Sequence, residues 1–253
     1  MDLQLTGRRA LVTGGTRGIG RAIVEALAGE GTAVAFCARD AAEIAATEKE
    51  VAGRAGPVKG AVVDVSDGPA LTAWVGASAA HLGGIDIVVS NVSALAIPNT
   101  EDSWRASFEV DLMGAVRMVG AAMPHLEQSD AAVILAISSV SGREIDFTAG
   151  PYGTMKAALV HYVQGLAYTL ASKGIRANTV SPGNTFFEGG VWDQIQQGDP
   201  ALYASSLALN PTGRMGTSKE MADAVIFLAS PLSSFTSGTN LVVDGALTRG
   251  VQL

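Results

Sequence analysis

The chain alternates between short runs of nearly continuous apolar residues and longer segments in which apolar residues recur every three or four positions. Continuous apolar runs are typical of strands buried on both faces, as in a parallel sheet. They span residues 9–13, 32–37, 58–64, 85–90, 131–138, 175–181 and 239–244. Between them the periodicity is helical. In IGRAIVEALAGEG, Ile19, Ile23 and Leu27 share one face, and Gly29 and Gly31 are suited to end the helix.

This alternation of strand and helix predicts an α/β fold, in which right-handed crossovers build a parallel sheet with helices on both faces. Seven strands fit one doubly wound sheet. The sequence has no linker rich in Pro, Gly or Ser, no block of like charge and no internal repeat. We therefore expect residues 1–253 to form a single domain.

One segment, residues 185–216, departs from this rhythm because it is long and mixes aromatic residues with glycines. It follows the sixth predicted strand. Ligands of open α/β sheets bind beyond the carboxyl ends of the strands. Long segments of this kind in compact domains usually have a function or are disordered. We expect residues 185–216 to cover a substrate as a lid, although a surface excursion without function is the plainer alternative.

Composition narrows the class of protein. Charged residues make up 16% and apolar residues 48%, which is typical of a globular chain. The net charge of −7 argues against nucleic acid or an anionic membrane as partner. A single cysteine, Cys37, excludes an internal disulfide framework and a cysteine-based metal cluster, and no metal is expected. No window reaches the roughly 18 apolar residues of a membrane helix, and no signal-type stretch precedes the first strand. We expect a soluble, cytoplasmic protein.

The first predicted strand leads directly into TGGTRGIG (residues 13–20) and then into a helix. Gly14, Gly18 and Gly20 have the spacing G-x-x-x-G-x-G, which permits a tight turn and lets backbone amides approach a pyrophosphate. The helix N-terminus adds a partial positive charge. Glycines also serve strand-to-helix turns for geometry alone, but this position at the first junction favours a dinucleotide site.

Two arginines point to the kind of dinucleotide. An acidic residue at the end of the second strand would bind a ribose diol and favour NAD, but the chain has Ala38 and Arg39 there. Arg17, within the glycine turn, is expected near the same place. Two guanidinium groups suit the 2′-phosphate of NADP. The alternative is that both arginines are solvated surface residues and that Asp40 partly neutralises Arg39.

The stretch SSVSGREIDFTAGPYGTMK (residues 138–156) carries the candidate catalytic groups. Ser139 ends the fifth strand, while Tyr152 and Lys156 lie four residues apart on one face of the next helix. A nearby ammonium favours the phenolate, so the tyrosine becomes a usable general acid for ketone reduction or base for alcohol oxidation. Ser139 can donate a hydrogen bond to the substrate oxygen. Taken singly, these residues are equally well explained as a strand-end cap, a packing residue and a solvated lysine.

Together these motifs resemble the short-chain dehydrogenase/reductase family over nearly the whole chain. The resemblance implies a Rossmann-type fold, NAD(P)-dependent oxidoreduction and usually a homotetramer, with dimers also found. It implies that Tyr152 is the acid/base, that Lys156 binds the nicotinamide ribose and that Ser139 orients the carbonyl. The Ala38-Arg39 pair resembles the branch that prefers NADP(H). The cofactor-binding positions implied are Gly14, Thr16, Arg17, Gly18, Ile19, Gly20, Arg39, Asp64, Val65, Asn91, Tyr152, Lys156, Pro182, Gly183 and Thr185.

Three positions depart from the family pattern. Where the family usually has Asn-Asn-Ala-Gly, this chain reads SNVS at 90–93, and DGA at 244–246 replaces a closing Asp-Gly-Gly. Val92 and Ser93 are expected to narrow the space near the cofactor ribose, unless Ser93 offers the substrate a hydroxyl. In FEVDLMGAV, Asp111 stands where the fourth catalytic residue, normally asparagine, holds a water of the proton relay. An aspartate accepts from that water but cannot donate, and its charge can pair with Lys156.

The leading hypothesis is an NADPH-dependent oxidoreductase that reduces a ketone to a secondary alcohol, or runs the reverse reaction, slowed by Asp111. The alternatives are a catalytically weak NADP(H)-binding regulator and a scaffold that binds no cofactor. The expected partner is a small carbonyl or alcohol substrate with a hydrophobic part. Five residues are candidates for its apolar wall, although each also suits the core or an oligomer contact: Ile145, Phe147, Phe186, Phe187 and Trp192.

Overall fold

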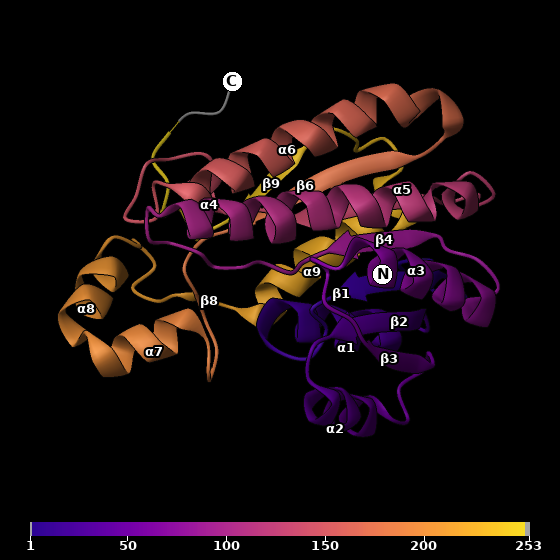
Figure 1. Cartoon of the computed structure of the whole chain (residues 1–253), viewed down its shortest axis with the longest axis horizontal. Helices are drawn as coiled ribbons and strands as arrows, with labels where there is room; N and C mark the ends of the chain where they lie inside the picture. Colours follow the sequence, from indigo (N-terminus) through magenta and orange to yellow (C-terminus); the bar gives the residue numbers. More distant parts are fainter. Residues whose placement is uncertain (1, 251–253) are drawn as a thin grey trace.

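A computed structural model describes residues 2–250, and its strands coincide closely with the apolar runs of the sequence. The strands of the main sheet are β1 (Arg9–Thr13), β2 (Ala33–Ala38), β3 (Val58–Val62), β4 (Ile87–Ser90), β5 (Val133–Ile137), β6 (Arg176–Pro182) and β9 (Asn240–Val243). All neighbouring pairs are parallel, in the order β3-β2-β1-β4-β5-β6-β9. The predicted Rossmann-type, doubly wound, seven-stranded sheet in a single domain is confirmed (Figure 1).

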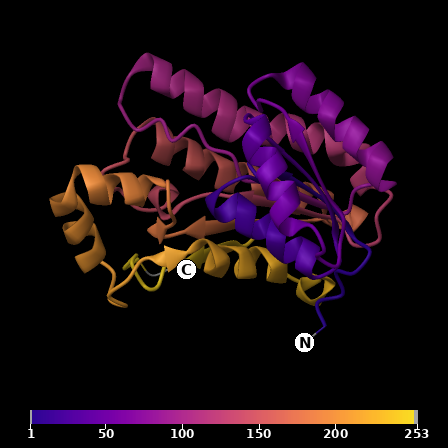
Figure 2. The ribbon, with the colours of Figure 1, turned by 90° about the horizontal axis from the view of Figure 1, so that it is seen from below.

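Helices cover both faces of the sheet (Figure 2). They are α1 (Gly18–Gly29), α2 (Ala41–Val51), α3 (Gly68–Leu82), α4 (Glu101–Ser107), α5 (Gly114–Leu126), α6 (Pro151–Leu170) and α9 (Ser218–Ala229). One core contains α3, α5 and α6, and the other contains α1 and α9 with part of α2. Successive residues of a strand serve opposite cores: Ile134 belongs to the first, while Val133 and Leu135 belong to the second. This double burial explains why the strands are continuously apolar.

The strand order reverses between β1 and β4, because the chain first builds outward to β3 and then returns to the other side of β1. Ligands of open α/β sheets bind in the crevice at such a reversal, outside the carboxyl ends of the strands. The glycine turn follows β1, and the loop that contains Asn91 follows β4. The topology therefore brings the predicted cofactor residues to one edge of the sheet.

Segment 185–216 forms a small substructure of its own beyond that edge. It consists of β7 (Thr185–Phe186), α7 (Val191–Gly198), α8 (Pro200–Ala208) and β8, which extends just past it (Gly216–Thr217). β7 and β8 pair in parallel, so the two ends of the segment meet at a narrow base. In Figure 1 the helices α7 and α8 project at the left, away from the packed layers.

The opposite, amino-terminal edge of the sheet is pinned by Asp86, which is 1% exposed. Arg9 donates to its carboxylate from the backbone N–H and from Nε and Nη2, at 2.7–2.9 Å, and Ser129 Oγ donates at 2.6 Å. Burial alone would raise the pKa of Asp86, but these hydrogen bonds and the Arg9 charge outweigh it and hold the pKa below its usual value.

A surface hollow of about 330 Å³ lies near Asp86, lined by Arg9, Gly83 and His125 among others. It is at the edge remote from the candidate catalytic groups.

Within the described part of the chain, no helix is long and apolar enough to cross a membrane.

Candidate active site

Tyr152 and Lys156 lie one turn apart on α6, as the i, i+4 spacing predicts. Lys156 Nζ is 5.7 Å from the centre of the Tyr152 ring. The tyrosine is half-buried, whereas the lysine is only 2% exposed. Lys156 Nζ donates a hydrogen bond of 3.1 Å to the carbonyl oxygen of Ile137, the last residue of β5. The ammonium is thus fixed beside the phenol at the carboxyl edge of the sheet.

Two glycines let the Ser139 loop pack closely against α6. A Cβ atom on Gly142 would stand 2.8 Å from the backbone nitrogen of Ala157, and one on Gly153 would stand 2.8 Å from the carbonyl oxygen of Ser141. Real Cβ atoms do not approach so closely, so larger residues would separate the loop from the helix. The contact holds the strand-end serine against the turn that carries Tyr152 and Lys156.

The serine pair itself is hydrogen-bonded into this junction. Ser138 Oγ donates to the carbonyl oxygen of Lys156 at 2.9 Å, and Ser139 Oγ accepts from the backbone N–H of Ser141 at 3.1 Å. Because the Ser139 oxygen accepts here, its own proton is available to a substrate oxygen. Ser139 is 8% exposed, which limits its access to water.

Asp111 is buried against Lys156. The two side chains are 0% and 3% exposed, and Lys156 Nζ lies 3.1 Å from Asp111 Oδ1. Asp111 Oδ2 accepts a hydrogen bond of 3.0 Å from the backbone N–H of Ala94. Oδ1 has a charged neighbour but no aligned hydrogen-bond donor. The charge pairing expected from the sequence is therefore present, and one carboxylate oxygen can still accept a hydrogen bond.

The position of Asp111 depends on a local irregularity. The helix from α4 to α5 passes through a π-helical segment, η1 (Phe108–Met113), which contains Asp111. π-Helical turns of this kind are rare in proteins overall, but those that occur often lie at functional sites. The sequence did not reveal this turn, since FEVDLM reads as part of an ordinary amphipathic helix.

The glycine turn has the backbone that the spacing predicts. Gly14 and Gly18 have φ values of +71° and +52°, a conformation that other residues rarely adopt. A Cβ on Gly20 would stand 2.1 Å from the carbonyl oxygen of Gly14. Asn91 braces the turn from β4, since its Nδ2 donates to the carbonyl oxygens of Thr13 and Gly14 at 3.1 and 3.3 Å.

The start of α1 can accept an anion. No side chain caps this helix at Arg17, and its first turn contains no acidic residue. By contrast, Asp40 caps α2 and Asp67 caps α3. The uncapped amides and the helix dipole fit a pyrophosphate group. The residues present therefore suit a dinucleotide.

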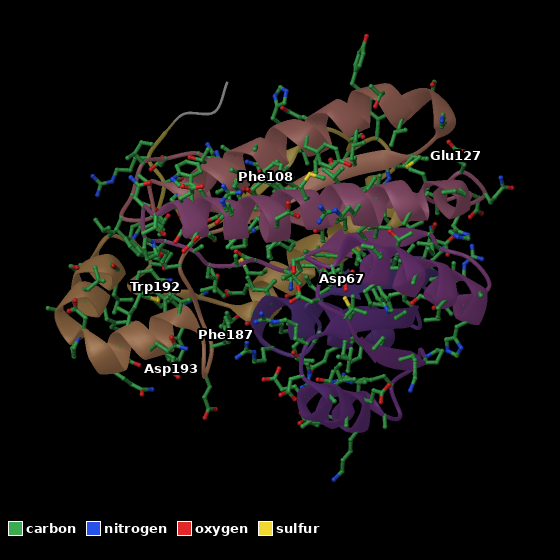
Figure 3. The ribbon with its side chains drawn as sticks, viewed as in Figure 1. Asp67, Phe108, Glu127, Phe187, Trp192 and Asp193 are labelled. Carbon is green, nitrogen blue, oxygen red and sulfur yellow. The ribbon has the colours of Figure 1, made fainter. Side chains whose placement is uncertain are left out.

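Phe187 lies on this turn, which the sequence did not suggest. A Cβ on Gly18 would stand 2.5 Å from Phe187 Cζ, so the ring covers the glycine directly. Figure 3 shows Phe187 between the base of segment 185–216 and the start of α1. From the sequence, Phe187 is expected only as a candidate for the substrate wall, because no local pattern indicates a contact between residues so distant in the chain.

The corner beside the glycine turn holds the two predicted arginines. Arg17 and Arg39 are both exposed. Asp40 does not pair with Arg39, because its carboxylate caps α2 by accepting from Ala42 and Glu43 at 2.8 and 2.9 Å.

Asp64 lies on the far side of this corner, at the end of β3. Hydrogen bonds from the Ser66 hydroxyl and backbone N–H lower the pKa of Asp64, and the charge of Arg39 adds to the effect. The next residue, Val65, is 5% exposed and belongs to the core.

A third carboxylate, which sequence reasoning missed, enters the same corner. Glu43 Oε2 accepts a hydrogen bond of 2.8 Å from Thr16 Oγ1 and lies 3.6 Å from Arg17 Nε. Its only signal in the sequence is its place in the first turn of the helix that follows β2.

The residues that the family resemblance assigns to the nicotinamide lie where β6 ends. Pro182 is buried, and a Cβ on Gly183 would stand 2.7 Å from Asp244 Cβ, so only glycine fits between the two chain segments. Thr185 Oγ1 donates to the Gly183 carbonyl oxygen at 3.0 Å. Val92 packs against Gly14, where a Cβ would stand 2.9 Å from Val92 Cγ2.

The candidate apolar wall is split between two elements. Phe147 and Trp192 make an edge-to-face contact with ring centres 5.9 Å apart, which joins the loop before α6 to α7. Phe186 instead packs on Tyr203 of α8, at 6.3 Å. Ile145 is 91% exposed. Of the five candidate wall residues, Phe147 and Trp192 connect segment 185–216 with the loop that carries Ser139.

Comparison with known proteins decides the family. Residues 14–248 match a family model described as enoyl-(acyl carrier protein) reductase. The isoepoxydon dehydrogenase of Penicillium expansum is 39% identical, over 98% of this chain and 97% of its own length. The 3-oxoacyl-(acyl-carrier-protein) reductase of Vibrio harveyi is 32% identical, over 97% of this chain and 99% of its own length. The chain belongs to the short-chain dehydrogenase/reductase family.

A solved structure of this family is also similar throughout. It is an NADPH-bound short-chain oxidoreductase of Pseudomonas aeruginosa, described as containing an atypical catalytic centre. Its TM-score is 0.88 at 32% identity, and the match covers 97% of this chain and 99% of that chain. As a short-chain dehydrogenase/reductase, the protein is an oxidoreductase that acts on CH–OH or C=O groups.

Proposed function

We propose that the protein is an NADPH-dependent oxidoreductase that converts a ketone to a secondary alcohol, or runs the reverse reaction. The observation that carries the proposal is the buried ammonium of Lys156, 5.7 Å from the Tyr152 ring and packed against the Ser139 loop. A lysine held beside a phenol at the dinucleotide edge of the sheet is the arrangement that acid/base chemistry at a carbonyl requires.

In this mechanism the protein moves one proton and stabilises one oxygen. Ser139 donates a hydrogen bond to the substrate carbonyl oxygen, and Tyr152 transfers its hydroxyl proton to the same oxygen as negative charge develops there. The Lys156 ammonium stabilises the phenolate that remains. When bound, the nicotinamide would supply the hydride in reduction and accept it in oxidation.

Asp111 acts through Lys156. A buried ammonium is costly without a counter-charge, and Asp111 supplies one at 3.1 Å. The carboxylate also weakens the pull of the ammonium on the phenolate, so the enzyme works more slowly than one with a neutral residue beside a charged lysine. The oxygen Oδ1, which lacks an aligned donor, can accept from the water of an altered proton relay.

The cofactor is NADP(H) rather than NAD(H). Its 2′-phosphate would meet the exposed guanidinium groups of Arg17 and Arg39, and the end of β2 offers the ribose no acidic side chain. Asp64 and Val65 would border the adenine, and Ile19 the pyrophosphate. The NADPH bound by the Pseudomonas relative supports the same choice.

The substrate is a small ketone with a hydrophobic part, covered by residues 185–216 as a lid. The contact of Phe147 with Trp192 supports this, because it joins the segment to the loop beside Tyr152. Its narrow base at β7 and β8 suits a segment that moves as a unit. The relatives' names, a dehydrogenase and a reductase, support both reaction directions.

The working form is a homotetramer, or a homodimer, in the cytoplasm. β9 is an edge strand whose residues are all only half-buried. Large apolar side chains are exposed near it, notably Phe235 at 104% and Tyr168 at 88%. An unpaired edge with apolar neighbours favours contact with a second copy.

Turnover tests the proposal. NADPH oxidation is measured with a panel of ketones for the unaltered protein and for Tyr152→Phe. We expect the variant to lose about 10²- to 10⁴-fold in turnover, which is the usual contribution of a general acid, while it still binds NADPH. Equal turnover in the two proteins would exclude Tyr152 as the acid.

The same experiment separates the alternatives. A catalytically weak regulator, for which the Asp111–Lys156 pair is the argument, would bind NADPH without turning over any ketone. A scaffold would show no rise in melting temperature when NADPH is added.

A further inference from the structure

Glu43 occupies the place in the structure where the two dinucleotide cofactors differ. It lies in the first turn of α2, directly after β2, and its carboxylate contacts two residues of the glycine turn. Thr16 Oγ1 donates to Glu43 Oε2 at 2.8 Å, and Arg17 Nε lies 3.6 Å from the same oxygen. The Glu43 side chain is 39% exposed and that of Arg17 is 65% exposed, so both can be reached from solvent.

The other carboxylates of this corner are committed elsewhere. Asp40 accepts from two backbone N–H groups of α2, and Asp64 accepts from the N–H and hydroxyl of Ser66. Glu43 differs from both, because its partners are side chains that would themselves bind a phosphate. Thr16 donates its single hydroxyl proton to Glu43, and Arg17 shares its charge with it.

We propose that Glu43 is a specificity-determining residue that weakens binding of the 2′-phosphate of NADP(H) and leaves NAD(H) binding unchanged. The inference rests on the proposed function, because it concerns how strongly that site prefers NADPH. A phosphate that binds Arg17 approaches a carboxylate of the same sign and competes with it for the guanidinium and for the Thr16 hydroxyl. A ribose diol has no charge and meets no such competition.

The size of the effect follows from the exposure of these groups. Partly exposed charges interact weakly in water and are screened by salt. We therefore expect Glu43→Gln to raise affinity for a 2′-phosphate by about threefold to tenfold at low salt, and by less as salt is added. Glutamine keeps an oxygen that accepts from Thr16, so the change removes the charge and preserves the shape of the turn.

The experiment compares two pairs of probes by isothermal titration calorimetry near neutral pH. NADPH and NADH differ only in the 2′-phosphate, and so do 2′,5′-ADP and 5′-AMP, which lack the nicotinamide. The proteins are the unaltered chain, Glu43→Gln and Glu50→Gln. Glu50 lies on the same helix and pairs with Arg21, so its variant is a matched control for lost charge.

The inference is supported if Glu43→Gln binds NADPH and 2′,5′-ADP more tightly than the unaltered chain does. The affinities for NADH and 5′-AMP must change by less than about twofold. Glu50→Gln must leave the affinities for all four probes unchanged. An equal gain for both members of a pair would overturn the inference, since the effect would then not involve the 2′-phosphate. Weaker binding of NADPH would also overturn it, because Glu43 would then serve to orient Arg17.

Failure of the inference is distinguishable from failure of the proposed function. If the unaltered protein binds NADH as tightly as NADPH, the proposed cofactor preference is wrong, and the pair of 2′,5′-ADP and 5′-AMP still decides the role of Glu43. If NADPH is preferred and Glu43→Gln leaves that preference unchanged, the proposed function stands and the inference about Glu43 is wrong.

Discussion

Lys156 and Asp111 form a buried ion pair, in which each charge stabilises the other. Their side chains are 3% and 0% exposed, and the ammonium also contacts the Ile137 carbonyl oxygen and the Tyr152 ring. Removing one member of a buried pair leaves the other uncompensated, which is more damaging than removing both. The pair therefore links the stability of the fold to the chemistry of Tyr152.

Asp111→Asn tests this link. We expect turnover to rise on the order of tenfold, because the neutral amide no longer weakens the pull of the Lys156 ammonium on the Tyr152 phenolate. Steady-state NADPH oxidation with the best ketone measures the effect. A loss of turnover would show that the aspartate is an adaptation rather than a handicap.

A stability cycle provides the control. Lys156→Met and Asp111→Leu each leave one buried charge and should each destabilise the fold by roughly 3 kcal/mol. The double variant has no buried charge at this site, and we expect it to recover most of the lost free energy of unfolding. Urea denaturation of the four proteins measures the coupling, and strictly additive losses would contradict it.

Asp86 makes stability depend on pH at the other edge of the sheet. Its pKa in the folded protein is held below the unfolded value by the hydrogen bonds from Arg9 and Ser129, which outweigh the effect of burial. Its contribution is therefore complete above about pH 4, the unfolded value, and is lost as the pH falls through the lowered folded pKa.

Asp86→Asn should accordingly destabilise the protein by about 2 kcal/mol at neutral pH. The difference from the unaltered protein should shrink as the pH falls below about 4, where the native carboxylate also becomes protonated. Urea denaturation at a series of pH values measures both curves. A constant offset at every pH would show that Asp86 does not titrate as inferred.

At the scale of single residues, the sequence predicts which side chains carry the chemistry better than it predicts which side chains touch. Tyr152 and Lys156 were predictable as neighbours because a helix fixes the i, i+4 geometry. The sequence shows that Asp111 can pair with Lys156, but it does not show that the two side chains meet. The contacts of Phe187 with Gly18 and of Glu43 with Thr16 were not, because both depend on how separate elements pack and leave no periodic pattern in the chain.

At the scale of the elements, helix α1 tolerates added volume at its end but not at its start. A Cβ at Gly20 would stand 2.1 Å from the Gly14 carbonyl oxygen and 2.4 Å from Asn91 Nδ2, whereas nothing lies within 4 Å of one at Gly29. Both glycines belong to the same helix. They therefore form a matched pair for substitution.

Gly20→Ala should destabilise the protein by about 3 kcal/mol, because a backbone carbonyl and the bracing amide would have to move. Gly29→Ala should be neutral or stabilise it by about 0.5 kcal/mol through reduced freedom of the unfolded chain. Thermal melts with and without NADPH measure both. Equal melting temperatures for the two variants would show that the turn adapts more easily than its geometry implies.

The strands were predictable where both of their faces are buried. The five residues of β5 are all buried, so the run VILAI reads as a strand without ambiguity. β3 is an edge strand with no buried residue, and its run was predicted two residues too long. The helices of segment 185–216 and the π-helical segment η1 were missed, because short helices and local changes of turn do not alter apolar periodicity enough to be seen.

The whole molecule presents two unlike edges. β3 forms one edge of the sheet and β9 the other, and Phe235, the most exposed aromatic side chain of the described residues, precedes β9 closely in the chain. Gln164 of α6 donates to the carbonyl oxygen of Gly238 at 3.2 Å, so α6 and the approach to β9 form one continuous surface. This surface is the one expected to meet another copy of the chain.

We expect the protein to run in multi-angle light scattering as four copies of its 25.8 kDa chain, or as two. Phe235→Asp should lower that mass, because it places a charge in the apolar contact. Val62→Asp is the control, since Val62 is 61% exposed on the opposite edge strand and should leave the mass unchanged. A monomeric unaltered protein would contradict the proposed assembly.

The strand order also has a consequence for how the chain is made. β6 is complete at Pro182, but its outer neighbour β9 begins only at Asn240. During synthesis, therefore, the outer backbone groups of β6 remain unpaired while the whole of segment 185–216 and α9 emerge. Exposed strand edges invite aggregation, and non-local parallel pairing is slow. A growing chain of this protein is most vulnerable over that interval, when a chaperone that shields β6 would protect it best.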